Sequence, residues 1–196
     1  MRYVFIALTA LSCAFGDPIT YTFTGNADGT IDGTNFTDAK LTVTASGDTS
    51  DVTFNAPNQT YFLNFSGGMA DFTINGIGGG TFTDAYVFDN QEFGVAGFGL
   101  TSDIIQTHDS SIGSTSFASY NLKSAIGPLG PESSDPSTGD WVGLATSLGS
   151  LTVTSYDNVV FQATTAGAPE PVSVPILGVA IIGMTIIARR RIAPAK

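Results

Sequence analysis

Apolar side chains alternate with hydroxyl and amide side chains in many short runs between Asp17 and Thr165. In "KLTVTA", which begins at Lys40, the leucine, valine and alanine share one parity and the two threonines share the other. Successive side chains of a β-strand point to opposite faces, so a period of two places the apolar groups together on one face. The pattern predicts half-buried antiparallel strands rather than helices.

Clusters of turn residues separate these runs. The segments "NADG", "GDTSD" and "NAPNQ" favour turns, and Asp28-Gly29 predicts a tight hairpin. Many short strands predict an all-β fold, specifically an antiparallel β-sandwich or jelly-roll-like domain over residues 17–165. Disorder is the alternative, but aromatic residues are too frequent for a chain without a core. The predicted core includes Phe23, Leu41, Val43, Phe54, Phe65, Val153 and Phe161.

One long stretch interrupts the strand pattern. The segment "SFASYNLKSAIGPLGPESSDPSTGDW", from Ser116 to Trp141, contains Pro128, Pro131 and Pro136. Proline has no backbone N–H and cannot donate a hydrogen bond to a neighbouring strand. The sequence therefore predicts a long loop that covers one end of the sandwich.

The charge of the chain limits its partners. Its 196 residues include 17 acidic and 7 basic side chains, which gives a formal net charge of −10. Between Asp17 and Ala168 the only cations are Lys40 and Lys123. A protein that binds nucleic acid needs a cationic surface to release counterions, so we expect no nucleic-acid partner. Cys13 is the single cysteine, so no internal disulfide and no cysteine-based zinc site is available.

Residues 1–16, "MRYVFIALTALSCAFG", have the organisation of a secretory signal peptide. Arg2 precedes an apolar stretch, and small residues follow that stretch. Cleavage after Gly16 or after Ala14 fits the small residues. The alternative is a lipoprotein signal acylated at Cys13, but no branched apolar residue stands three positions before that cysteine. The segment predicts export.

A second apolar segment runs from Val172 to Ala188 and would extend about 26 Å as a helix at 1.5 Å per residue. This length approaches the ~30 Å hydrocarbon core of a bilayer, so we expect a single transmembrane helix. Arg189, Arg190 and Arg191 follow directly. Cations resist translocation, which predicts a cytoplasmic C-terminus and an external central domain.

Pro169, Glu170 and Pro171 stand just before this apolar segment. The order of Pro-Glu-Pro, a short apolar helix and an arginine cluster resembles the PEP-CTERM sorting tail of exported proteins in Gram-negative bacteria. The resemblance covers Pro169 to Arg191, and Ala168 stands where valine is common in that family. It implies processing by exosortase, a membrane cysteine protease that cuts at or near Pro-Glu-Pro, followed by delivery to the cell surface or extracellular matrix. An ordinary single-span anchor with incidental prolines is the alternative.

The predicted organisation of the chain has four parts. These are a signal peptide at 1–16, a β-sandwich domain at 17–165, a linker with the Pro-Glu-Pro motif at 166–171, and a transmembrane helix with a basic tail at 172–196. The two prolines resist helix formation, so the predicted helix does not extend outward through them. We expect Glu170 to remain accessible to a protease near the membrane surface.

Few residues are candidates for catalysis. His108 is the only histidine, and the aspartate and serines beside it in "QTHDSS" do not make a triad by adjacency, so we expect an exposed loop histidine. Asp84, Asp89 and Glu92 cluster around one strand end, and two carboxylates can hydrolyse a glycosidic bond. No family signature accompanies them. We therefore predict no enzyme and no catalytic residue, and a single histidine predicts no zinc site.

The loop that begins at Asp28 partly resembles a calcium-binding loop. Asp28, Thr30 and Asp32 supply oxygen atoms and Gly33 follows, but Ala39 occupies the position that requires a bidentate glutamate. We predict weak calcium binding or none, and no metal or other cofactor in the domain.

Flat aromatic side chains can stack on sugars. The candidates are Trp141, Tyr61, Tyr86, Tyr120 and Tyr156, although burial in a core explains them equally well. Together with both terminal segments, the sequence predicts a non-enzymatic structural or adhesive protein that passes through the inner membrane to the cell surface or matrix. The expected partners are exosortase, the membrane in transit and exopolysaccharide. The alternative is an extracellular carbohydrate-binding module, or a glycoside-acting enzyme, on the same scaffold.

Overall fold

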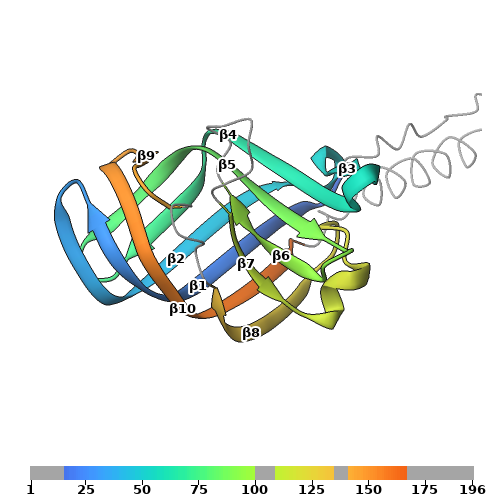
Figure 1. Ribbon diagram of the computed structural model, residues 1–196. Coiled ribbons are helices and arrows are strands. Elements are labelled where there is room, and N and C mark those ends of the chain that lie inside the picture. The colour runs from blue at the N-terminus through green and yellow to red at the C-terminus, as the bar shows by residue number, and fades with distance from the viewer. Residues whose placement is uncertain (1–15, 100–108, 135–140, 167–196) are drawn as a thin grey trace, which may run out of the picture. The chain divides into compact units, whose positions relative to one another are not determined.

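The computed structural model describes residues 16–99, 109–134 and 141–166 (Figure 1). Residues 1–15 of the predicted signal peptide, His108, and the sorting motif with its apolar segment and arginines lie outside the described residues. Within the described part, no helix is long and apolar enough to cross a membrane. The strands are β1 (Pro18–Ile31), β2 (Thr34–Asp48), β3 (Thr53–Asn55), β4 (Thr60–Ile74), β5 (Gly78–Asn90), β6 (Val95–Gly99), β7 (Asp109–Gly113), β8 (Ile126–Ser134), β9 (Leu144–Thr146) and β10 (Gly149–Thr165). Three short 3-10 helices accompany them: η1 (Thr49–Asp51), η2 (Ala56–Asn58) and η3 (Thr115–Ser119).

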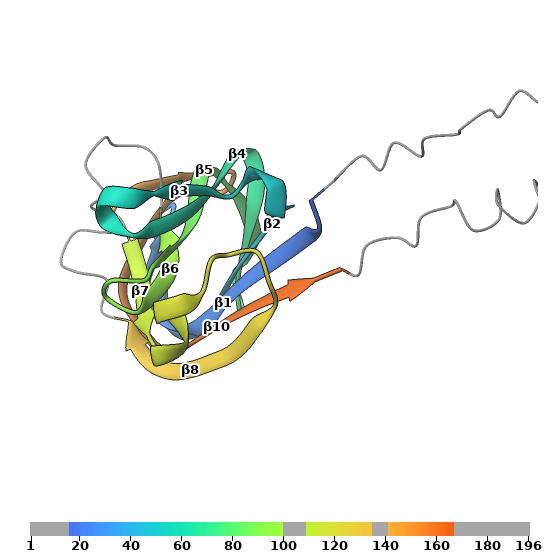
Figure 2. The same ribbon diagram turned by 90° about the vertical axis from the view of Figure 1, so that its right-hand side faces the viewer.

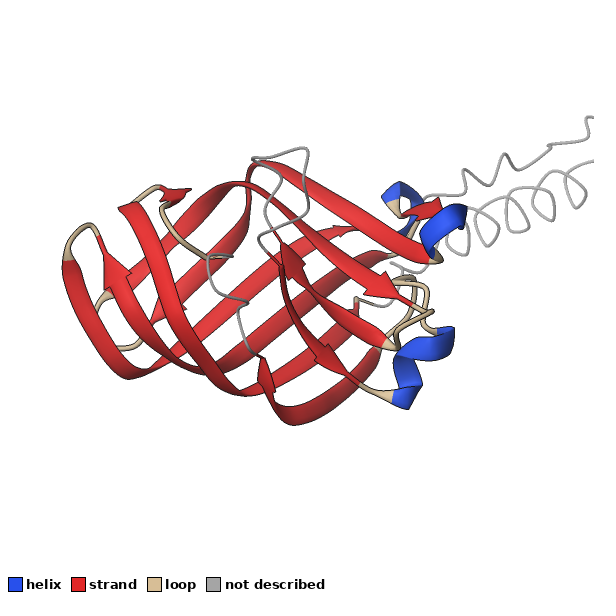
Figure 3. Cartoon of the chain, in the orientation of Figure 1, coloured by secondary structure: helices blue, strands red, loops and turns tan. Residues whose placement is uncertain are grey.

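All strand pairings are antiparallel, and no α-helix occurs in these three ranges, which confirms the all-β prediction (Figure 3). Hydrogen bonds join the strands in the order β3-β4-β2-β1-β10-β9-β5-β6-β7, and β8 pairs with β10. β4 also pairs with β5, so the sheet closes on itself through β4, β2, β1, β10, β9 and β5. The predicted sandwich has two separate sheets. In the structure, hydrogen bonds join the strands into one folded sheet.

Bulges explain how a single sheet encloses a core. The pairing register shifts in β1 between Thr24 and Asn26, and in β4 between Ser66 and Ala70. An extra residue on one strand bends that strand and increases its twist. Long strands therefore curve around the interior without ending at a corner, as the view along the domain in Figure 2 shows.

The inward strand positions hold one apolar cluster. All but one of the predicted core residues are at most 3% exposed: Phe23, Leu41, Val43, Phe65, Val153 and Phe161. The prediction for Phe54 is wrong, because this residue lies on the short edge strand β3 and is 51% exposed. Its ring packs instead on Tyr61, with ring centroids 4.5 Å apart.

The prediction of a long loop from Ser116 to Trp141 is wrong for Ile126–Ser134, which form β8, and residues 135–140 lie outside the described residues. β8 pairs with β10 within this stretch, with Leu129 opposite Phe161. Among the described residues β8 pairs with β10 alone, and a strand paired on one side tolerates proline where the missing N–H faces away. Gly130 has a φ of +113°, and a Cβ at this position would lie 2.3 Å from the carbonyl oxygen of Val159, so the close approach of the two strands requires glycine.

The first hairpin turns at Asp32 and Gly33, not at the predicted Asp28-Gly29. Both turn residues have positive φ, +46° and +79°, as a tight hairpin between twisted strands requires. Asp28 lies within β1, where its Oδ1 accepts the backbone N–H of Asp38 at 2.7 Å. This contact to β2 keeps the earlier Asp-Gly pair inside the strand.

The chain enters and leaves the domain side by side. β1 pairs with β10, with Ile19 opposite Thr165, and the Ala166 N–H donates to the Pro18 carbonyl oxygen at 3.1 Å. The three 3-10 helices lie at the same end (Figure 1). We call this end the terminal end, and we call the opposite end, which carries the Asp32-Gly33 turn, the distal end.

Candidate functional site

A pocket of about 330 Å³ opens at the terminal end. Its lining combines aromatic rings with amide, hydroxyl and carboxylate groups from β4, β5 and the segments that flank them. Its volume is within the range of small-molecule sites, which are typically apolar with a few polar groups. We call it the aromatic pocket. Its lining residues are Asn58, Thr60, Phe62, Phe88, Asn90, Glu92 and Phe93.

The pairing of β4 with β5 builds the floor of the aromatic pocket. Thr60 lies opposite Asn90, and Phe62 lies opposite Phe88. The adjacent Leu63 is buried in the core, so alternation along β4 directs Phe62 to the outer face of the sheet. Two rings on neighbouring strands therefore provide an apolar surface on that face.

The turn after β5 places a third ring at the rim. The Asn90 side-chain oxygen accepts the Phe93 N–H at 3.2 Å, and the Gln91 N–H donates to the Gln59 carbonyl oxygen at 3.0 Å. These bonds hold the turn against the segment before β4. Phe93 is 73% exposed beside the two rings of the floor. An exposed ring at the edge of a pocket is available for contact with a ligand.

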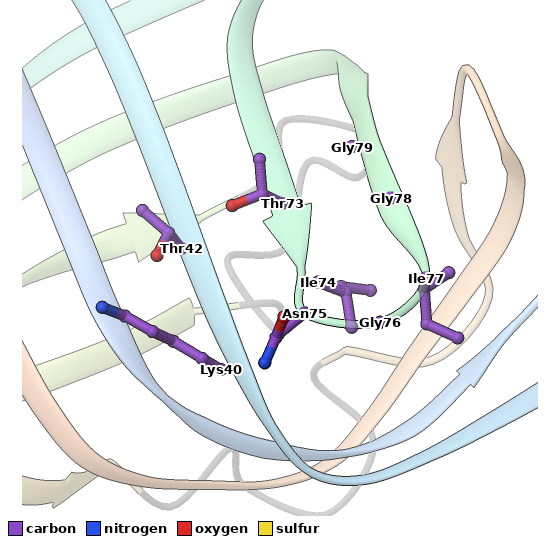
Figure 4. Close-up of a pocket in the computed structure, with 9 residues that line it drawn as sticks. All are labelled: Lys40, Thr42, Thr73, Ile74, Asn75, Gly76, Ile77, Gly78 and Gly79. Carbon is purple, nitrogen blue, oxygen red and sulfur yellow. The ribbon is translucent and has the colours of Figure 1, made fainter.

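A second pocket, of about 830 Å³, lies at the distal end. Figure 4 shows Lys40 of β2 beside the turn between β4 and β5, where Asn75 and Ile77 lie. This pocket opens over a glycine turn, where a Cβ at Gly76 or Gly78 would meet no atom within 4 Å. Open space over a glycine turn does not surround a ligand. We call this region the distal pocket and place the candidate site in the aromatic pocket.

One carboxyl group is buried beneath the aromatic pocket. Asp89 lies between Phe88 and Asn90 on β5, opposite Tyr61 of β4, and is 0% exposed. Neither of its carboxylate oxygens has a hydrogen-bond partner. Burial raises the pKa of Asp89 to about 8, because the charged form loses its hydration. Asp89 is therefore mostly a neutral acid at pH 7.

Buried tyrosines surround the same part of the core. Burial raises the pKa of Tyr120, and the nearby Tyr21 and Asp89 raise it further. The Tyr120 hydroxyl donates to the Ser124 carbonyl oxygen at 3.0 Å, and the Tyr21 hydroxyl donates to the Leu122 carbonyl oxygen. These hydroxyls remain protonated and tie the segment after η3 to the core.

The structure does not unite Asp84, Asp89 and Glu92 in a paired-carboxylate site. Asp84 is exposed and Asp89 is buried, because their odd spacing along β5 directs them to opposite faces of the sheet. Glu92 lies beyond the strand, where it lines the aromatic pocket. Carboxylates on opposite faces cannot flank one glycosidic bond.

The aromatic residues singled out from the sequence lie outside the aromatic pocket. Trp141, Tyr120 and Tyr156 are core residues that are at most 4% exposed. The Tyr156 hydroxyl donates to the carbonyl oxygens of Phe23 and Leu41, each at 3.1 Å. Packing in the core accounts for the aromatic rings of these three residues. Tyr61 is partly buried under Phe54, and Tyr86 is 5% exposed.

The sequence did not single out Phe62, Phe88 or Phe93 as site residues. The sequence does contain a signal for Phe93, because it is the one apolar residue in "NQEFG", a stretch whose asparagine and glycine favour a turn. The sequence contains no such signal for Phe62 and Phe88, because their positions opposite each other depend on the register between β4 and β5.

The loop that begins at Asp28 and partly resembles a calcium-binding loop is held by hydrogen bonds within the protein. Asp28 Oδ1 accepts the Asp38 N–H at 2.7 Å, and Asp28 Oδ2 accepts the Ser155 hydroxyl at 3.0 Å. Asp32 lies in the hairpin turn. The part of the chain that the structure describes contains no group of three or more His, Cys, Asp or Glu side chains that could hold a metal ion. Weak or absent calcium binding stays a prediction.

No family model, curated protein or solved structure matches the chain. The PEP-CTERM resemblance therefore rests on its sequence motif, and the candidate site rests on its own geometry. The aromatic pocket can bind a small ligand with one apolar face and several hydroxyl groups. Its rings provide apolar contact, and its amide, hydroxyl and carboxylate groups provide hydrogen bonds. Among the residues that the structure describes, no histidine, lysine or cysteine lines this pocket.

Proposed function

We propose that the chain is an exported protein delivered by a PEP-CTERM tail to the cell surface or extracellular matrix of a Gram-negative bacterium. There it has a structural or adhesive role and associates with exopolysaccharide. The observation that carries the proposal is the order of Pro169-Glu170-Pro171, an apolar segment and Arg189–Arg191. Exosortase is the processing partner, and the inner membrane holds the chain in transit.

In this proposal the chain comprises a signal peptide, a β-sandwich-like domain, a linker and a transmembrane helix. The pairing of β1 with β10 supports the proposal. A domain whose first and last strands are neighbours can follow an export signal and precede a sorting tail without either segment crossing the fold. A tail that continues from Ala166 attaches to the terminal end of the domain.

In this proposal the role is non-enzymatic, and Asp84 and Asp89, which lie on opposite faces of β5, do not act together on one glycosidic bond. The alternative, an extracellular carbohydrate-binding module, is favoured by the aromatic pocket itself. Its rings and amide groups have the composition of a sugar site. Sorting to the surface and sugar binding are compatible in one chain.

Substitution of the motif tests the proposal. Replacing Pro169, Glu170 and Pro171 with alanine leaves signal cleavage intact and traps the protein in the membrane, because the protease loses its extended recognition segment. Replacing Arg189, Arg190 and Arg191 with serine weakens retention, so some full-length chain moves outward unprocessed. Mass spectrometry of surface and membrane fractions locates both mature termini. Normal removal of the C-terminal segment from the triple-alanine chain contradicts the proposal.

A further inference from the structure

We propose that the aromatic pocket binds a short stretch of a neutral polysaccharide, with Phe93 stacked on a sugar ring and Asn58 and Glu92 hydrogen-bonded to sugar hydroxyls. The inference deepens the proposed function and rests on it only for the presence of an extracellular polysaccharide. Three features of the pocket support it: its rings, its polar rim and its charge.

The rings match the apolar face of a sugar. A pyranose presents C–H groups on its faces and hydroxyl groups around its edge. Phe62 and Phe88 pair across β4 and β5 to form the floor, and Phe93 stands 73% exposed at the rim. Stacking on Phe93 removes apolar surface of both partners from water, while the sugar edge remains free for hydrogen bonding.

The polar rim matches the edge of a sugar. Asn58 and Glu92 are exposed and line the same pocket as Phe93, to which they contribute an amide and a carboxylate. An amide offers both donors and acceptors, and a carboxylate accepts hydrogen bonds from hydroxyl groups. Hydrogen bonds to a charged acceptor are the stronger kind, so Glu92 orients a bound sugar. The side-chain oxygen of Asn90 is engaged with the Phe93 N–H and fixes the turn.

The charge of the pocket selects a neutral chain. Glu92 is the only charged side chain among the described residues that line it. Lys40 lines the distal pocket, and the other cation of the described domain, Lys123, does not line the aromatic pocket. Uronate or sulfate groups would meet a carboxylate without a compensating cation, on a domain of negative net charge. Sugar hydroxyls carry no such penalty.

Calorimetric titration of the full-length chain in detergent micelles tests the inference. The probes are cellohexaose, laminarihexaose and mannohexaose as neutral oligosaccharides, and hexagalacturonate as an acidic one. We expect at least one neutral probe to bind and hexagalacturonate to bind more weakly. Phe93→Ala weakens binding about tenfold, which corresponds to one stacked ring. Phe54→Ala is the matched control, because Phe54 is an exposed ring outside the pocket lining, and it leaves the affinity unchanged.

Glu92→Gln separates the role of charge from that of stacking. This variant retains a hydrogen-bonding side chain and reduces the discrimination against hexagalacturonate. Absence of binding by every neutral probe overturns the inference, as does tighter binding of hexagalacturonate than of all neutral probes. Equal losses in Phe93→Ala and Phe54→Ala also overturn it. Each of these results leaves the sorting proposal intact, because that proposal is tested by the location of the chain and by its mature termini.

Discussion

The two ends of the domain carry pockets of opposite character. The distal pocket is the larger, at about 830 Å³ against about 330 Å³ for the aromatic pocket. It opens over Gly76 and Gly78, where an added Cβ would meet no atom within 4 Å, whereas rings and amide groups line the smaller pocket. Volume alone therefore does not locate a ligand-binding site in this protein. Binding of a sugar requires rings together with hydrogen-bonding groups, and that combination lines the pocket at the terminal end.

Two glycines, one at each end, differ in the free space around their Cα atoms. β6 and β7 approach closely near the aromatic pocket, where a Cβ at Gly97 would lie 2.1 Å from the Ser110 carbonyl oxygen. The distal turn is open, because a Cβ at Gly76 would meet nothing within 4 Å. An added methyl group should therefore meet the backbone at Gly97 and free space at Gly76.

Gly97→Ala is expected to have the largest effect. The added methyl group meets a backbone oxygen that belongs to a paired strand and cannot move alone, so we expect a loss of about 3 kcal/mol in the free energy of unfolding. Urea unfolding measures the change. Gly113→Ala on β7 is the control, because its nearest atom is a flexible carboxylate oxygen 3.6 Å away. A Gly97→Ala protein as stable as the control would show that the two strands can separate without cost.

Asp89→Asn is expected to stabilise the protein by about 2 kcal/mol at pH 7, because each unit of pKa shift is worth about 1.4 kcal/mol and burial of the asparagine amide offsets part of the gain. The folded-state pKa of Asp89 is raised from 3.8 to about 8. Folding therefore takes up a proton between these values, and the stability of the native protein falls as pH rises through this window.

The pH dependence of the stability difference distinguishes this mechanism from a packing effect. Thermal melts of both proteins should nearly coincide at pH 4 and separate progressively up to pH 8, and the Asp89→Asn variant should give the flatter profile. Asp84→Asn is the matched control on the exposed face of the same strand and should show no such divergence. A difference that stays constant across this range contradicts the buried-acid explanation.

Gly76→Ala should cost about 1 kcal/mol, because its φ of +80° strains an alanine although space is free. This smaller loss sharpens the contrast with Gly97→Ala, since both variants add the same methyl group. Urea unfolding under the same conditions compares them. A loss at Gly76 as large as that at Gly97 would show that the close approach at Gly97 costs no more than the backbone strain at Gly76.

Phe93→Ala should have the smallest effect on stability, within about 0.5 kcal/mol of the native protein, because its ring is 73% exposed. Lys40→Ala in the distal pocket should be equally neutral. The two variants differ only in sugar affinity, which Phe93→Ala reduces and Lys40→Ala does not. Melting temperatures and calorimetric titration together test this pair. A marked loss of stability in Phe93→Ala would mean that the ring supports the fold rather than a ligand.

The amino-acid sequence determined the strand character of the domain and most of its core. Alternation is a local property, so Leu41 and Val43 can be assigned to one face without knowing which strand lies beside them. The same rule fails for Phe54, whose strand lies at an edge of the sheet. Burial depends on what covers a face as well as on parity.

Only the tertiary structure decided the closure of the sheet, the inclusion of β8 and the position of the aromatic pocket. Each depends on register between segments distant in sequence, such as β8 with β10 and the closure through Phe82 and Thr146. The placement of Phe62 beside Phe88 likewise follows from pairing. An alternating pattern indicates that a residue faces outward. It does not indicate which residue of another strand lies beside it. That choice is made by the bulges, the turn geometry and the packing of the whole sheet around its core.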